Sequence, residues 1–396
     1  MTPRGDGLDA EGFLDGADVL VCCGSGGVGK TTIAAVIGLE AARRGRCAVV
    51  VTIDPAKRLA DALGLAGGLG PEPQPVQLDR RGGTGELWAM MLDTAAAFDA
   101  VVTRNAGDAA QAERILANPF YRNMAGALSG TQEYMAAETL HLLHGDARFD
   151  LVVVDTPPSR NALDFLEAPG VLARFLDHRL FKLLMLPTRR GMRVMNAATQ
   201  PILRAIGKVV GSDVLADAVA FFQAFAGMET GFRERAEVVI DLLRSDATRY
   251  VVVASPHRET VAEAVWFAGK LRAQGITNVT GVVNRIHPRF GTGAADAMAA
   301  FDDADDADAA DTAELAAGDL TVEHALAAAD AAADPAVAAL WRNVAELRAF
   351  AVAEHAELAP FTAALAGAAT RAVPLLAGDV HDLTTLAEIR HHLFGS

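Results

Sequence analysis

A glycine-rich stretch between two apolar segments constrains this chain more than any other feature. Residues 24–32 read Gly-Ser-Gly-Gly-Val-Gly-Lys-Thr-Thr. The run at 19–23 before it is typical of a buried strand, and residues 33–43 after it predict a helix. Glycines let successive backbone N–H groups point at phosphate oxygens, and the positive end of the following helix favours the same charge. The stretch therefore predicts a phosphate-binding loop.

Two kinds of nucleotide loop fit the glycines. Those at 24, 26 and 29 also match the dinucleotide pattern G-x-G-x-x-G, and Asp54 lies near the place of a ribose-binding acid, ~20 residues on. A dinucleotide site has no use for an amine and a hydroxyl directly after the last glycine, whereas a magnesium triphosphate needs both. Because Lys30 and Thr31 stand there, the sequence favours a triphosphate loop. Lys30 is expected to reach the β- and γ-phosphates and Thr31 to hold Mg²⁺.

Three polar residues follow apolar, strand-like runs farther along the chain. Asp54 follows residues 47–53, Asp155 follows 151–154 and Asn284 follows 279–283. In open parallel sheets, ligands bind at the carboxyl ends of the strands. We expect Asp155 to order Mg²⁺ and its waters, and Asp54 to add to that metal site and to orient or deprotonate an attacking water. Asn284 is expected to contact a purine edge. The alternative is that these residues only end strands and begin turns.

The order of strand and helix patterns predicts an α/β fold. We expect a P-loop NTPase with a mostly parallel central sheet flanked by helices, plus an inserted helical subdomain. The expected boundaries are an N-terminal tail at 1–17, an ATPase domain at 18–290 with helical insertions at about 95–146 and 170–243, an acidic linker or loop at 291–317, and C-terminal helices at 318–396 whose final strand and helix complete the ATPase domain.

Composition narrows the classes of partner. The 396-residue chain carries a formal net charge of −15, which argues against a nucleic-acid binder. No apolar run reaches the ~18 residues of a membrane span, and residues 1–16 lack the apolar core of a signal peptide. We therefore expect a cytoplasmic protein that is not integral to a membrane. The three cysteines form no C-x-x-C pair, so we expect core thiols.

Together these segments resemble the ArsA-type ATPases, the anion-pump and tail-anchored-protein-targeting ATPases of the MinD-like branch. The family loop G-K-G-G-V-G-K-T is matched at 24–31 except at Ser25, and its first switch, D-P-A-H-x-L-S-D, is matched at 54–56, 59 and 61. Its second switch, D-T-A-P-T-G-H, is matched at 155, 156 and 158, and its adenine segment V-V-N at 282–284. The resemblance covers most of residues 18–290. The Ala-rich composition and the sequence of the second switch are similar to those of paired actinobacterial members.

The resemblance implies Mg²⁺-dependent ATP hydrolysis that closes a dimer and rearranges inserted helices around a hydrophobic client or membrane partner. Asp54 and Lys30 are the expected catalytic residues. The expected metal ligands are Thr31, Asp54 and Asp155. The residues expected to bind ATP are Gly24, Ser25, Gly26, Gly27, Val28, Gly29, Lys30, Thr31, Thr32 and Asn284.

Ser25 departs from the family pattern. By the resemblance, a lysine at this position reaches across the dimer to the opposite phosphates, and serine has neither its length nor its charge. The chain is therefore expected to form either a homodimer or a heterodimer with a lysine-bearing homologue. Three other functions remain open: a catalytically weak regulatory subunit, a MinD/ParA-like positioning ATPase, and a metalloid-pump subunit, for which the metal-binding cysteines are missing.

Two apolar stripes at helical spacing occupy the second expected insertion. One falls within residues 172–186, and the other includes Leu215, Ala218, Phe222 and Phe225 with Phe221 beside it. Arcs this broad must be buried against something. A groove for an apolar client and mutual packing of the inserted helices explain them equally well.

Overall fold

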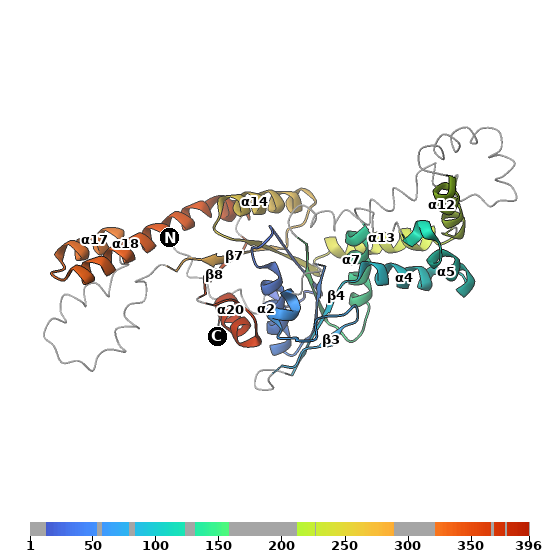
Figure 1. The fold of residues 1–396 in the computed structure, drawn as a ribbon, viewed down its shortest axis with the longest axis horizontal. Helices are drawn as coiled ribbons and strands as arrows, with labels where there is room; N and C mark the ends of the chain where they lie inside the picture. The colour runs from blue at the N-terminus through green and yellow to red at the C-terminus, as the bar shows by residue number, and fades with distance from the viewer. Residues whose placement is uncertain are drawn as a thin grey trace.

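The computed structural model describes residues 13–53, 58–78, 84–122, 131–157, 212–225, 227–288, 321–365, 368–376 and 378–395. They form one eight-stranded sheet with the order β3-β4-β2-β5-β1-β6-β7-β8 (Figure 1). Among these strands β3 runs antiparallel to β4 and the other pairings are parallel, which confirms the expected fold class. The strands are β1 (Val19–Gly24), β2 (Cys47–Thr52), β3 (Gln74–Pro75), β4 (Glu86–Met91), β5 (Leu151–Asp155), β6 (Thr248–Ala254), β7 (Val279–Ile286) and β8 (Thr370–Pro374).

Helices cover both faces of the sheet. Successive side chains of a strand point to opposite faces, so the apolar run of β1 is buried on both sides. Val19 and Val21 face one core cluster and Leu20 faces the other. The first cluster is closed by α7 (Thr131–His144), α13 (Glu229–Arg244), α14 (Arg258–Ala273) and α19 (Ala359–Ala364). The second is closed by α2 (Lys30–Arg43), α3 (Arg58–Ala62) and α20 (Leu383–Phe394).

A third apolar cluster lies beyond the sheet, at the end of the molecule where Figure 1 labels α4, α5 and α12. Phe221, Phe222 and Phe225 are buried there against one another and against Phe120 and Tyr121. These phenylalanines of the second stripe thus take part in mutual packing of the inserted helices. The first stripe, at 172–186, lies outside the described residues. The helices concerned are α4 (Thr94–Asn105), α5 (Ala109–Leu116) and α12 (Ser212–Phe225), with parts of α7 and α13.

A buried ion pair joins α7 to α13 beneath this cluster. The Arg235 guanidinium lies 2.8 Å from the Glu138 carboxylate, which is 2% exposed, and stacks over the Phe232 ring. The Tyr134 hydroxyl donates to the same carboxylate, and burial raises the pKa of that tyrosine. Removing one partner of such a pair leaves a buried charge uncompensated, so the contact between the two helices depends on both residues.

The C-terminal part adds a helical hairpin and completes the sheet. The hairpin consists of α17 (Val322–Ala331) and α18 (Pro335–Glu357) and projects from the sheet on the side away from α12 (Figure 1). Asp334 caps α18 by accepting from the Ala336 N–H at 2.8 Å, with proline in the first turn. Beyond the hairpin, β8 pairs in parallel with β7. The Glu354 carboxylate on α18 accepts from the His287 N–H and lies 2.9 Å from its Nδ1.

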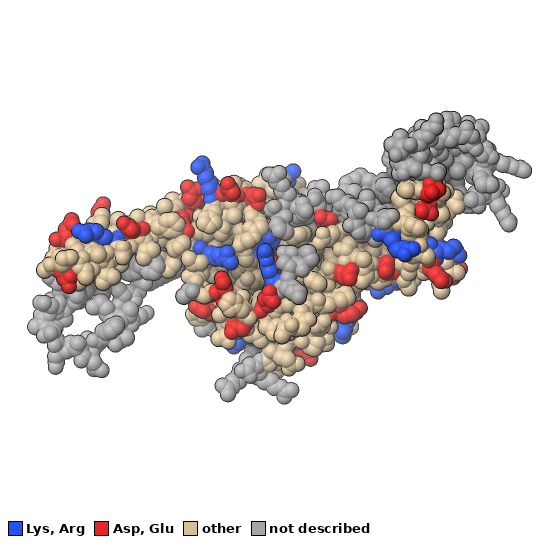
Figure 2. Space-filling view, in the orientation of Figure 1, with Lys and Arg blue, Asp and Glu red and all other residues tan. Residues whose placement is uncertain are grey.

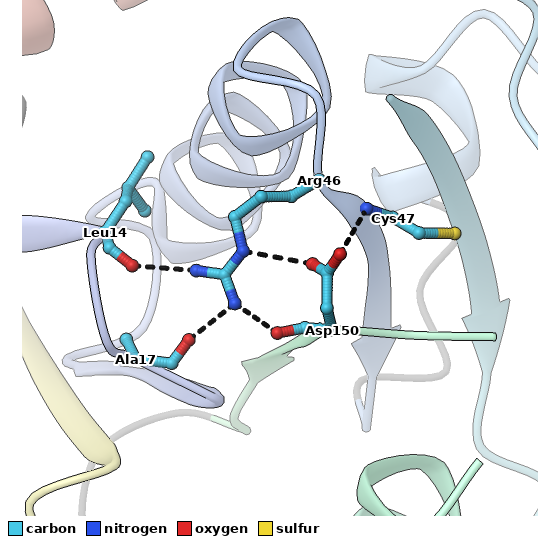
Figure 3. A network of polar contacts seen from close by, with 5 residues as sticks. All are labelled: Leu14, Ala17, Arg46, Cys47 and Asp150. Atoms are coloured by element: carbon cyan, nitrogen blue, oxygen red, sulfur yellow. Dashed lines mark hydrogen bonds and ion pairs between the residues drawn. The ribbon is translucent and has the colours of Figure 1, made fainter. Parts of the chain in front are cut away.

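The amino ends of the strands are joined by Arg46 (Figure 3). Its guanidinium donates to the carbonyls of Leu14 and Ala17, both at 2.7 Å, and to the carboxylate and carbonyl of Asp150. Asp150 in turn accepts from the Cys47 N–H at 3.1 Å. Residues 13–17 therefore pack against the sheet, whereas residues 1–12 of the expected tail lie outside the described part.

Four further points bear on the sequence-based expectations. The sequence predicts a loop over 64–75, but Gln74 and Pro75 form β3, an edge strand, where a missing N–H is tolerated. On the face shown in Figure 2, Lys and Arg are interspersed with Asp and Glu. Within the described residues, every helix is too short or too polar to cross a membrane. The acidic linker expected at 291–317 falls outside them.

Candidate nucleotide site

The glycine loop begins where β1 ends, and two of its glycines are required by close approach. Gly24 has φ 149°, and a Cβ there would lie 2.1 Å from the Val253 carbonyl oxygen. Gly29 has φ 93°, and a Cβ there would lie 2.2 Å from Nδ2 of Asn284. Any other residue at these positions forces the loop or its neighbours to move. The loop therefore depends on contacts from β6 and β7 as well as on its own sequence.

Lys30 is the first residue of α2, and its side chain folds back over the loop. Its Nζ donates to the Ser25 carbonyl at 2.8 Å, and the residue is only 7% exposed. The ammonium group thus lies within the loop at the N-terminus of the helix. Both the charge and the helix dipole favour an anion there.

Thr31 and Asp155 meet as the sequence predicts. The Thr31 hydroxyl donates to Oδ2 of Asp155 at 2.7 Å, and the carboxylate is fully buried at the end of β5. A hydroxyl and a carboxylate are the kind of oxygen donors that Mg²⁺ prefers, and this ion usually takes one or two carboxylates and completes its shell with phosphates and waters. The donor set therefore fits Mg²⁺ bound together with a phosphate.

Thr52 is a site residue that the sequence reasoning missed. It ends β2, is 2% exposed, and donates its hydroxyl to the same Oδ2 of Asp155 at 2.8 Å. β2 and β5 are parallel neighbours in which Thr52 pairs with Asp155. A polar residue at the last position of an apolar strand next to the acid-bearing strand is the signal that would have found it.

The thiol beside this acid is kept in its neutral form. Cys22 pairs with Asp155 in the sheet; burial raises the pKa of its thiol, and the carboxylate raises it further. Burial also raises the pKa of Cys23. Both are core thiols, as their apolar surroundings predict.

Asn284 and Arg285 at the end of β7 contact the back of the loop. Asn284 is 5% exposed, and its Nδ2 donates to the Val28 carbonyl at 2.8 Å. Arg285 has a left-handed backbone, φ 61°, and its guanidinium donates to the Gly27 carbonyl at 3.4 Å. Purine contact by Asn284 stays a prediction, because the contact made here is with the loop.

Ser25 points into its own chain. It is 5% exposed, and its hydroxyl donates to the Glu263 carboxylate of α14 at 2.5 Å. The position at which the family carries a lysine is therefore occupied by a buried hydroxyl next to an acid.

Asp54 lies outside the described residues, but the backbone N–H and carbonyl of the preceding residue, Ile53, both have hydrogen-bond partners. The Ile53 N–H donates to the Asp155 carbonyl, and the Ile53 carbonyl accepts from Nε2 of Gln132, on α7, at 2.9 Å. The first turn of α7 thus contacts the residue that directly precedes Asp54.

The glycine loop lies between a buried strand and a helix, Lys30 folds over it, and Thr31 is bonded to the acid of a parallel strand. These features define a P-loop NTPase fold. The comparison with known proteins narrows this class. The sequence model of the anion-transporting ATPases matches residues 17–298, so the chain belongs to that family.

Curated relatives agree with this assignment. The chain is similar to an ATPase GET3 of Malassezia globosa, with 31% identity over 40% of this chain and 44% of the relative, and to an ATPase GET3 of Rhodotorula glutinis, with 29% identity over 53% and 55%. An uncharacterized protein, SCO2128, of Streptomyces coelicolor is 28% identical over 68% of this chain and 62% of the relative. The chain thus spans about half the length of these three curated relatives, between 44% and 62%.

Proposed function

We propose that this protein binds ATP with Mg²⁺ at the loop and hydrolyses the terminal phosphate bond. The observation that carries the proposal is the meeting of the Thr31 hydroxyl and the Asp155 carboxylate beside a loop that holds Lys30. Bound Mg²⁺ supplies neutralisation of charge on the β- and γ-phosphates. Lys30 contributes a positive charge to the same phosphates, and the N–H groups of the loop hold them in place.

Asp54 is the residue proposed to orient the attacking water. It follows Ile53, whose two backbone hydrogen bonds, to Asp155 and Gln132, hold the chain at the metal-bearing edge. A carboxylate in that position accepts a hydrogen bond from a water and fixes its approach to phosphorus.

The proposal extends to coupling between the nucleotide and the inserted helices. α7 supplies Leu140 to the core beneath the sheet and Met135 to the aromatic cluster of the insertion, and its Gln132 contacts Ile53. A shift at the strand end therefore acts on a helix shared by both cores. We propose that ATP closes a dimer in the cytoplasm, either a homodimer or one with a homologous ATPase, and that the inserted helices handle a hydrophobic client or membrane partner.

Phosphate release by the purified chain in the presence of ATP and Mg²⁺, together with its mass in solution, tests the proposal. Lys30→Ala, Asp54→Asn and Asp155→Asn are expected to reduce the rate at least tenfold, and Asp330→Asn, at an exposed position of α17, serves as the matched carboxylate control. A rate that persists in all three site variants would refute the proposed site. ATP binding without turnover would leave a nucleotide-binding subunit in place of a self-sufficient enzyme.

A second candidate function is a catalytically weak subunit that pairs with a lysine-bearing homologue. It is favoured by the burial of the Ser25 hydroxyl against Glu263, which leaves position 25 without a basic group directed toward a second molecule. If Ser25→Lys raises the rate severalfold and Glu263→Gln raises it further in that background, the weak-subunit candidate gains support. Equal rates in the parent and Ser25→Lys chains, both as dimers, would remove it.

A further inference from the structure

We infer that Asn284 and Arg285 act together as positioning residues for the phosphate loop. They bind two successive carbonyls of the loop, those of Val28 and Gly27, and thereby aim the following N–H groups at the phosphates. The inference rests on the proposed function, since it assigns a task at the same site.

Peptide geometry converts carbonyl contacts into N–H directions. In a planar trans peptide, the C=O of one residue and the N–H of the next point in opposite directions. With the Gly27 carbonyl held by Arg285, the N–H of Val28 points to the other side of the loop. With the Val28 carbonyl held by Asn284, the N–H of Gly29 points the same way. A donor that polarises a carbonyl also strengthens the N–H of the same peptide as a donor.

The backbone of β7 is distorted at Arg285, where two neighbouring side chains must both reach the phosphate loop. Successive residues of a regular strand point to opposite faces, so two neighbours do not reach one loop. The pairing of β7 with β8 shifts register between Val283 and Ile286, and Arg285 within that bulge has φ 61°. A left-handed arginine costs free energy that the surrounding structure must supply, and such strain gathers at functional sites. Here the distortion brings two neighbouring side chains to one loop.

The two residues are also held from behind. Asn284 is buried so closely against Gly29 that a Cβ on the glycine would lie 2.2 Å from its amide nitrogen. Two residues after Arg285, the backbone N–H and the ring of His287 are bound by Glu354. Because the strand end is held on both sides of Arg285, the contacts to the two loop carbonyls are fixed in one arrangement.

A positioning role and a purine contact predict effects on different sets of ligands. A side chain that touches the base affects only ligands that carry a base, whereas one that aims loop N–H groups affects every polyphosphate. Inorganic tripolyphosphate with Mg²⁺ therefore separates the two roles.

The experiment is calorimetric titration of the full chain with Mg²⁺-ATP and with Mg²⁺-tripolyphosphate. Arg285→Ala is expected to weaken both ligands by the same factor, roughly 3- to 10-fold, as for the loss of one hydrogen bond. Asn284→Ala is expected to weaken both by roughly tenfold or more, since a buried carbonyl then loses its donor. Arg285→Lys should recover part of the loss because an ammonium group still donates to the Gly27 carbonyl. Asn278→Ala, at the other end of the strand, should change neither affinity.

Two outcomes overturn the inference. Weaker ATP binding with unchanged tripolyphosphate binding would assign the pair to the base, and unchanged binding of both ligands would assign it no part in the site. Arg285→Gly guards against a general loss of stability, since glycine accepts the left-handed backbone. It should unfold at a higher urea concentration than Arg285→Ala and still bind both ligands as weakly. A parent chain that binds neither ligand would instead refute the proposed function.

Discussion

Replacing Thr52 by valine removes one hydrogen bond from the acid at the centre of the site and keeps the size of the side chain. The residue is 2% exposed and donates to Oδ2 of Asp155 at 2.8 Å, and valine has nearly the same volume. A hydrogen bond to a charged group contributes about 1.5–3 kcal/mol. We expect the free energy of unfolding to fall by that amount, because the substitution opens no cavity to add to the loss.

Urea unfolding without nucleotide measures this loss, and calorimetric titration with Mg²⁺-ATP separates it from binding. Thr52→Val keeps the proposed metal ligands Thr31 and Asp155, so its affinity for ATP should change less than threefold. Thr31→Val removes a similar bond, of 2.7 Å, and a proposed metal ligand with it, so its affinity should fall at least tenfold. A change in stability below about 0.5 kcal/mol for Thr52→Val, the range of ordinary surface substitutions, would refute the reasoning.

Three other substitutions or reactions probe the rest of the molecule. Gly29→Ala should cost at least about 1 kcal/mol for its left-handed φ and reduce ATP affinity more than tenfold, because its Cβ displaces Asn284; parent-like binding would contradict this. A thiol reagent at pH 8 should modify Cys47 slowly, and Cys22 and Cys23 only after urea unfolding, because burial raises the pKa of all three thiols. Rapid labelling of all three thiols in the folded protein would contradict this prediction. Arg46→Ala should lower unfolding free energy by about 2–4 kcal/mol with ATP affinity unchanged, and weaker ATP binding would show that the two ends of the sheet are coupled.

The fold was largely predictable because its signals are local. Apolar runs such as that of β1 depend on neighbours in the chain, and their alternation with helical patterns predicted the strands, the helices and the parallel order. The pairing of Thr31 with Asp155 was predictable for the same reason, since a motif and a strand end each fix one partner. The roles of the site residues stay predictions that the proposed experiments address.

What the sequence did not predict depends on distant segments. Thr52 looks like one more β-branched strand residue until the register of β2 against β5 places it beside Asp155. The direction of Asn284 depends on a bulge against β8, which is far away in the chain. The side chains of Phe221 and Phe222 were equally consistent with a groove and with a core, and Phe120 and Tyr121, which follow α5, supply ring contacts that bury them.

The position of β8 sets a delay during synthesis. β7 carries Asn284 and Arg285, and until its neighbour β8 is made it is an edge strand with unpaired backbone groups. About 80 residues separate the two strands, so at about 5–20 residues per second a ribosome leaves that edge open for roughly 4–16 seconds. The hairpin of α17 and α18 is synthesised within this interval, and Glu354 on it binds the strand end at His287. The support that Glu354 and β8 give to this strand, and through it to the phosphate loop, therefore forms only after α18 and β8 have been synthesised.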